Sequence, residues 1–282
     1  MERIAIVTDS TADLPLALVQ ELNIAVVPLE VHFGPEIYKD WVELTPQAFF
    51  EKLATSRVLP RTSQPSPADF ERVYRKLLEE YSTVISIHLS SQLSGTYQSA
   101  VLAQAAIPGA DIVVVDSKAA SMGVGLVVLE AAQMVRQGLG RAAVLQRVQE
   151  VIGKLHTILT VDTLDYLHRN GRIGRAQHLV GTLLNVKPIL QVDRDGFVAP
   201  LDRVRGRQQV IPRMVELAKE RVGPGAAVKM AVVHANVPER AEELARAAGS
   251  VFDVKALYVT ELGPVIGSHV GPGTLGLVLF AV

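Results

Sequence analysis

Short, β-branched apolar runs in the first half of the chain predict strands at residues 4–7, 25–31, 83–87 and 111–115. Segments of helical character between them predict helices ending near residue 22 and at about 41–53, 68–81, 95–103, 123–137 and 142–154. Strands that alternate with helices are typical of a parallel sheet covered on both faces. The pattern therefore predicts an N-terminal α/β domain of three layers, at residues 1–154.

The pattern changes after residue 155. Further strands are predicted at 156–161, 187–192, 197–204, 227–234, 253–260 and 276–282, with helices at 163–167, 176–184, 208–221 and 238–248. The tetrapeptide DRDG at residues 193–196 separates two of these strands and is typical of a hairpin turn. An antiparallel pair among helices predicts an α+β domain with a mixed sheet at residues 155–282. This boundary rests on the change in topology alone.

Composition narrows the function classes. The chain has 282 residues, of which 49% are hydrophobic and 20% charged, so an ordered protein with a large core is expected. Its net charge of -1 gives no reason to expect binding to nucleic acid or to an anionic membrane. The first residues are typical of a strand rather than a cleavable signal, and no apolar run reaches membrane-spanning length. We therefore expect a cytoplasmic protein without stable membrane insertion.

Several kinds of chemistry lack their usual signals. There is no cysteine, and the seven histidines show no zinc-binding spacing, so no metal site is expected. Neither a nucleophile elbow of the G-x-S-x-G type nor a phosphate-binding P-loop is present. Gly123 and Gly125 open a helix, but Val128 stands where a dinucleotide-binding fingerprint has its third glycine. We therefore expect no cofactor.

Ser94 lies between a predicted buried strand and a predicted helix. Ligands of open α/β sheets bind at the carboxyl ends of strands, and the free amides of a helix N-terminus favour an anion. This position predicts an anion site that includes the Ser94 hydroxyl. The alternative is that Ser94 only caps the helix.

Two further segments carry candidate binding residues. In residues 61–70, Ser66 and Pro67 are explained as a helix cap and first helical residue, whereas Thr62 is not explained by capping. His269 is expected in a glycine-rich turn between the last helix and the last strand, where backbone can approach a ligand and the imidazole can donate to an acid. The alternative for His269 is an ordinary surface residue.

Five segments together resemble the DegV family of bacterial fatty-acid-binding proteins. They are VTDSTADLP (residues 7–15), TSQPSPADF (62–70), SSQLSGTYQSA (90–100), LHRNGRIG (167–174) and VIGSHVGPGTLGL (265–277). The resemblance implies a two-domain protein that holds one long-chain fatty acid, such as palmitate, in a buried apolar tunnel between its domains. It also implies that Thr62 and Ser94 hydrogen-bond the carboxyl group and that His269 lies close to it.

The resemblance further implies a partner. Some proteins of this family present the acid to an ATP-dependent fatty acid kinase, and Arg172 is then expected to face the kinase or its phosphates. The implied role is a lipid carrier without catalytic residues. Two alternatives stay open: a hydrolase or phosphotransferase that uses Asp9, Thr62, Ser94 and His269, and an interaction module whose cavity is incidental.

Overall fold

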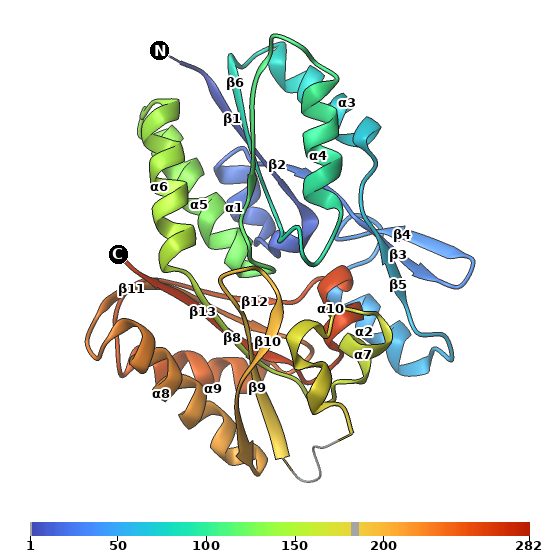
Figure 1. Ribbon diagram of the computed structural model, residues 1–282, viewed down its shortest axis with the longest axis vertical. Helices are drawn as coiled ribbons and strands as arrows, with labels where there is room; N and C mark the ends of the chain where they lie inside the picture. The colour runs from blue at the N-terminus through green and yellow to red at the C-terminus, as the bar shows by residue number, and fades with distance from the viewer. Residues whose placement is uncertain (1, 182–185) are drawn as a thin grey trace.

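The computed structural model describes residues 2–181 and 186–282, in which two large sheets are stacked with helices between them (Figure 1). The first sheet has four parallel strands in the order β2-β1-β6-β7. Its strands are β1 (Ile4–Asp9), β2 (Ala25–Val27), β6 (Thr83–His88) and β7 (Asp111–Asp116). The predicted parallel sheet of the first half is confirmed.

Helices cover both faces of this sheet because side chains alternate along its strands. Ala5 and Val7 of β1 pack in one apolar cluster with Phe70 and Tyr74. Ile4 and Ile6 point the other way, into a second cluster that includes much of α5. The helices concerned are α1 (Leu16–Glu21), α3 (Pro67–Leu78), α4 (Thr96–Ala105) and α5 (Met122–Arg136). The predicted three layers are therefore present.

A small antiparallel sheet, which the sequence pattern did not predict, lies beside these layers. It has the order β4-β3-β5, from β3 (Glu30–Phe33), β4 (Glu36–Lys39) and β5 (Arg61–Ser63). The single strand predicted at 25–31 was wrong, because the chain leaves the parallel sheet at Pro28 and enters the small one. The predicted helix at 41–53 begins later, as α2 (Pro46–Thr55), because Thr45 caps it and Trp41 has a left-handed φ of 63°.

The second large sheet is mixed, as predicted, with the order β10-β9-β8-β13-β11-β12. Its strands are β8 (His156–Thr160), β9 (Val186–Val192), β10 (Val198–Arg205), β11 (Ala227–His234), β12 (Asp253–Glu261) and β13 (Leu275–Ala281). Leu277 and Leu279 of β13 pack in the apolar cluster of α8 (Val210–Val222) and α9 (Pro238–Gly249), on one face. Val278 and Phe280 face the opposite side, toward α5 and α6 (Arg141–Lys154).

The layer that contains α5 is shared by both large sheets. One cluster of buried residues runs from Ile4 in β1 through α5 to Phe280 in β13. The domain division between residues 154 and 155 stays a prediction. The short helices α7 (Asp165–Arg169) and α10 (Pro264–Val270) pack together beside α2 near the middle of the molecule (Figure 1).

The helix predicted at 176–184 is a 3-10 helix at Gly174–Leu179, and residues 182–185 of that prediction lie outside the described residues. No helix in the described part of the chain combines the length and apolar character needed to cross a membrane.

Candidate ligand-binding site

Thr62 and His269, which are 207 residues apart in sequence, form a hydrogen bond of 2.8 Å between Oγ1 and Nε2. Thr62 lies on β5, which pairs with β3. His269 lies in the last turn of α10 and not in a loop, so the expected position in a glycine-rich turn was wrong. Gly267 lets α10 pack closely, because a Cβ atom there would stand 2.8 Å from the Phe49 ring. The structure therefore brings two predicted site residues into direct contact.

His269 is neutral at physiological pH. Burial lowers the pKa of its imidazole to about 3, and the nearby Arg172 guanidinium contributes further. Within the described residues, Nδ1 of this ring is buried and has no hydrogen-bond partner. A neutral imidazole can donate from one nitrogen and accept at the other, which allows it to orient the Thr62 hydroxyl.

Ser94 lies in the turn before α4. The helix begins at Thr96 with Gly95 in the N-cap position, so the predicted capping position was wrong by one residue. The Ser94 Oγ nevertheless accepts a hydrogen bond from the Thr96 amide at 3.3 Å. A Cβ atom on Gly95 would meet the Gln64 side-chain amide at 2.4 Å, so the segment after Thr62 packs directly against this turn. Glycine at position 95 therefore allows the two predicted segments to meet.

Arg172 follows α7 and connects the Ser94 turn to α10. Its Nε donates to the Leu93 carbonyl at 3.1 Å, and its Nη1 donates to the Asn170 carbonyl at 2.8 Å. The Asn170 side chain in turn donates to the Ser268 carbonyl at 2.9 Å. No carboxylate of residues 2–181 or 186–282 pairs with Arg172, so its charge is available to an anion.

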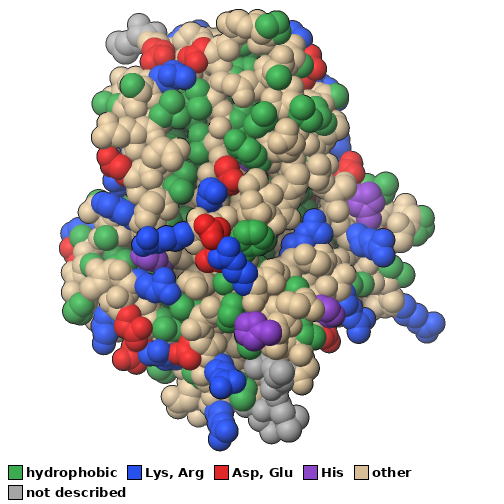
Figure 2. Space-filling view, viewed as in Figure 1, with side chains coloured by type: hydrophobic (Ala, Val, Ile, Leu, Met, Phe, Trp, Pro, Cys, Tyr) green, Lys and Arg blue, Asp and Glu red, His purple; other side chains and the backbone are tan. Residues whose placement is uncertain are grey.

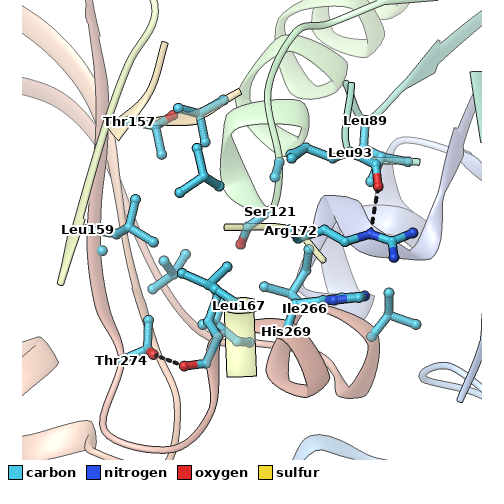
Figure 3. A pocket seen from close by; sticks show the side chains of 18 of the residues that line it. Leu89, Leu93, Ser121, Thr157, Leu159, Leu167, Arg172, Ile266, His269 and Thr274 are labelled. Carbon is cyan, nitrogen blue, oxygen red and sulfur yellow. Dashed lines mark hydrogen bonds between the residues drawn. The ribbon is translucent and has the colours of Figure 1, made fainter. Parts of the chain in front are cut away.

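Thr62, Ser94, Arg172 and His269 line one cavity, and most of its remaining lining is apolar. The space between its walls, including its opening to solvent, is about 840 Å³. Figure 3 shows the Arg172 side chain on one side and Thr157 and Leu159 on the other. Both halves of the chain line it, for example through Leu29, Leu89, Val233 and Val278. The cavity fits a molecule with one polar end and an apolar body.

Asp13 and Asp40 are site-supporting residues that sequence reasoning missed. Asp13 accepts hydrogen bonds from Ser121 Oγ at 2.6 Å and from the Gly263 amide at 3.0 Å. Asp40 accepts from the Val265 amide at 3.2 Å. Burial raises the pKa of Asp13 to about 8 and that of Asp40 to about 7. Both carboxyl groups hold the start of the helix that carries His269, a role that no local pattern signals.

Asp9 does not belong to the cavity. Its carboxyl group is fully buried and accepts hydrogen bonds from the Leu89 amide at 3.1 Å and from His88 Nδ1 at 2.9 Å. The grouping of Asp9 with Thr62, Ser94 and His269 was therefore wrong, because Asp9 is fully buried and does not line the cavity that the other three share. No group of three or more potential metal ligands is assembled within the described ranges.

Comparison with known proteins identifies the family. The family model described as "Uncharacterised protein, DegV family" matches residues 3–282. The chain belongs to the DegV family. A DegV domain-containing protein of Halalkalibacterium halodurans is 41% identical over 278 residues, which is 98% of this chain and 98% of the relative.

Solved structures of the DegV family share the whole fold. The structure of a DegV family protein from Thermus thermophilus, described as binding fatty acid, is 40% identical with a TM-score of 0.93, and the match covers 99% of this chain and 100% of that one. DegV of Bacillus subtilis, described as a fatty acid binding protein, is 35% identical with a TM-score of 0.90 and covers all of both chains, 100% each. The resemblance found in the sequence motifs is thus confirmed at the level of the family.

Proposed function

We propose that this DegV-family protein binds one long-chain fatty acid, such as palmitate, in the cavity between its two halves. The observation that carries the proposal is the hydrogen-bonded pair Thr62–His269, together with Ser94 and Arg172, in an otherwise largely apolar cavity. The fatty-acid binding of the Thermus thermophilus relative supports it. In this proposal the protein is a carrier and performs no catalysis.

The polar residues would hold the carboxylate. Neutral His269 donates Nε2–H to Thr62 Oγ1, which leaves the Thr62 hydroxyl proton for one carboxylate oxygen. The Ser94 hydroxyl would accept from the Thr96 amide and from the Thr96 hydroxyl, 2.9 Å away, and would donate its own proton to the acid. The unpaired charge of Arg172 favours the ionised acid over a neutral ester.

The acyl tail would supply most of the affinity. Burying about fifteen methylenes at roughly 0.8 kcal/mol each gives on the order of 12 kcal/mol before ordering costs. Each headgroup hydrogen bond contributes about 1–3 kcal/mol, but an unpaired buried carboxylate is costly. The hydroxyl groups therefore select for acids and fix their orientation.

We also propose that the protein presents the acid to an ATP-dependent fatty acid kinase. Thr62 lines both the cavity and an outer cleft formed by Arg57, Arg61 and Arg169, and the described lining of this cleft includes no carboxylate. A cationic cleft beside the headgroup suits the phosphates that a kinase would bring. Arg172, expected from the resemblance to face the kinase, lines the same cavity as Thr62, which supports a role in holding the carboxylate before transfer.

Lipid analysis of the purified protein tests the carrier role. The protein is denatured, extracted and analysed by mass spectrometry, and separately incubated with palmitate after delipidation. We expect about one fatty acid per chain. Absence of fatty acid before and after incubation would rule the proposal out, whereas hydrolysis of acyl esters by the protein alone would favour an enzyme.

A further inference from the structure

A second cavity, the basic groove, lies where the two halves of the chain meet. We define it by Lys118, His156, Arg175, Arg194 and Arg221, and its space including the mouth is about 1260 Å³. Figure 2 shows Lys, Arg and His side chains gathered on this face, around the end of α6 and the β9–β10 hairpin. Thr157 and Val192 line both this groove and the cavity that contains Thr62 and His269. In Figure 3, Thr157 lies on the side of that cavity opposite Arg172, so the groove lies behind this opposite wall.

The groove carries an excess of positive charge. Its lining holds four Lys and Arg side chains and two carboxylates, which leaves two positive charges in a chain whose net charge is -1. Arg175 uses its guanidinium for both carboxylates, at 2.6 Å from Asp193 and 2.7 Å from Asp195. In the described part of the chain, the charged ends of the Lys118, Arg194 and Arg221 side chains have no carboxylate partner, although the backbone amide of Lys118 donates to Asp116 at 3.0 Å. The uncompensated charge thus belongs to these three side chains.

These cations come from different elements and converge on one place. Arg221 at the end of α8 donates to Gln191 Oε1 on β9 at 3.2 Å. His156 at the start of β8 faces both Arg221 and Arg194, since the two guanidiniums add to burial in lowering the pKa of its imidazole. His156, Arg194 and Arg221 all line the groove, so the two guanidiniums and the imidazole border the same open space.

The backbone that presents the cations is held in place. Lys118 follows β7 in the left-handed region, with φ 53°, a conformation uncommon for a residue with a side chain. Ser117 fixes this turn by donating to the His88 carbonyl at 2.6 Å. The hairpin turn of Arg194 docks on it, since Ser90 Oγ donates to the Gly196 carbonyl at 2.9 Å. Ligands of α/β sheets bind at this edge, beyond the carboxyl ends of the strands.

We infer that the basic groove binds a phosphate-bearing small molecule through Lys118, Arg194 and Arg221. A phosphate dianion matches the excess of two charges, and guanidinium groups bind phosphate oxygens in pairs. Ile152 and Leu155 supply an apolar wall for the uncharged part of such a molecule. This inference does not depend on the fatty-acid site.

Calorimetric titration with inorganic phosphate, adenosine monophosphate and glycerol 3-phosphate at constant ionic strength tests the groove. The double variant Arg194→Gln/Arg221→Gln is expected to bind at least tenfold more weakly than the wild type. The control Arg72→Gln/Arg246→Gln removes the same charge from two exposed helix surfaces and is expected to stay within twofold. Circular dichroism verifies that both variants are folded.

The outcomes separate specific binding from general charge attraction. Equal weakening in both double variants, or no saturable binding of any of the three compounds to the wild type, would overturn the inference. If adenosine monophosphate binds most tightly, the groove recognises a nucleotide. If glycerol 3-phosphate binds most tightly, it recognises a lipid headgroup. If all three compounds bind equally well, the groove recognises the phosphate group alone.

Discussion

At the scale of single residues, the environment of Thr62 and His269 decides what the cavity can bind. The threonine hydroxyl and the imidazole form a hydrogen bond of 2.8 Å with each other. Because the imidazole is neutral, it orients the hydroxyl without placing a second positive charge beside Arg172. Under the proposed function, this arrangement prepares the polar part of the cavity for a single carboxylate.

Replacing the Thr62 hydroxyl tests this arrangement. Thr62→Val keeps the volume but removes one hydrogen bond to the acid and leaves His269 Nε2 unpaired, so the affinity for palmitate should fall roughly tenfold. Ser94→Ala should weaken binding in the same direction. Thr55→Val, on the exposed end of α2, is the matched control. Fluorescent fatty-acid displacement measures all three, and unchanged affinity in the Thr62 and Ser94 variants would refute their assignment.

The buried carboxyl of Asp13 predicts a pH dependence of stability. Its folded pKa of about 8 lies above the ordinary value of 3.8, so between about pH 4 and pH 8 the folded state keeps a proton that the unfolded state has lost. The free energy of unfolding should therefore contain a contribution that declines as the pH rises through this window. In urea titrations at pH 5 and pH 8, Asp13→Asn should show a smaller decline than the wild type. The exposed Asp165→Asn should behave as the wild type, and equal declines in all three would contradict the prediction.

At the scale of elements, the helix α5 shows why glycines can resemble a motif without serving its function. A Cβ atom on Gly125 would stand 2.7 Å from the Ala12 carbonyl oxygen, and one on Gly123 would stand 2.9 Å from the Ala119 side chain. Gly125 lets the helix pass close to the segment after β1, and Gly123 lets its first turn pack on Ala119. Close packing against neighbouring segments is therefore sufficient to explain both glycines.

Two alanine substitutions separate packing from helix propensity. Gly125→Ala should destabilise the protein by about 1–3 kcal/mol, because the added methyl meets backbone that cannot move easily. Gly153→Ala in α6 has nothing within 4 Å of its new methyl and should be neutral or stabilising by up to about 1 kcal/mol. Chemical denaturation compares the two, and equal effects would show that the contact with Ala12 has no cost.

At the scale of the whole molecule, the cavity exists only because both halves share one apolar core. α5 contacts strands of both large sheets, and α10 contacts β3, β5 and α2 of the first half. A ligand in this cavity therefore touches both halves at once. Its binding should stabilise them together rather than one at a time.

Ligand stabilisation gives a measure of tail burial. At a free palmitate concentration of a hundredfold Kd, the delipidated protein should gain about 2.7 kcal/mol in its free energy of unfolding. Myristate buries two methylenes fewer, at roughly 0.8 kcal/mol each, so its Kd should be roughly tenfold higher. Thermal unfolding at several ligand concentrations measures both, with methyl palmitate as the control for the acid group. Equal Tm shifts for the two acids would show that the tail contributes little.

Much of the fold was determined by local sequence. The run of buried residues in β6, the capping box of Ser66 and Asp69, and the β9–β10 turn, where Gly196 has a φ of 91°, follow from interactions between neighbouring residues. The five motifs were also sufficient to recognise the DegV family and to select Thr62, Ser94, Arg172 and His269, all of which line one cavity.

Other features were decided only by the tertiary structure. The short strands β3 and β5 form because they pair with each other. A segment of three or four residues is too short for its hydrophobic pattern to predict this pairing. Asp13 meets the Gly263 amide across 250 positions of sequence, and Asp9 is closed off from the cavity by contacts to His88 and Leu89. Burial and long-range hydrogen bonds set the protonation and accessibility of these groups, and both arise only when distant segments pack together.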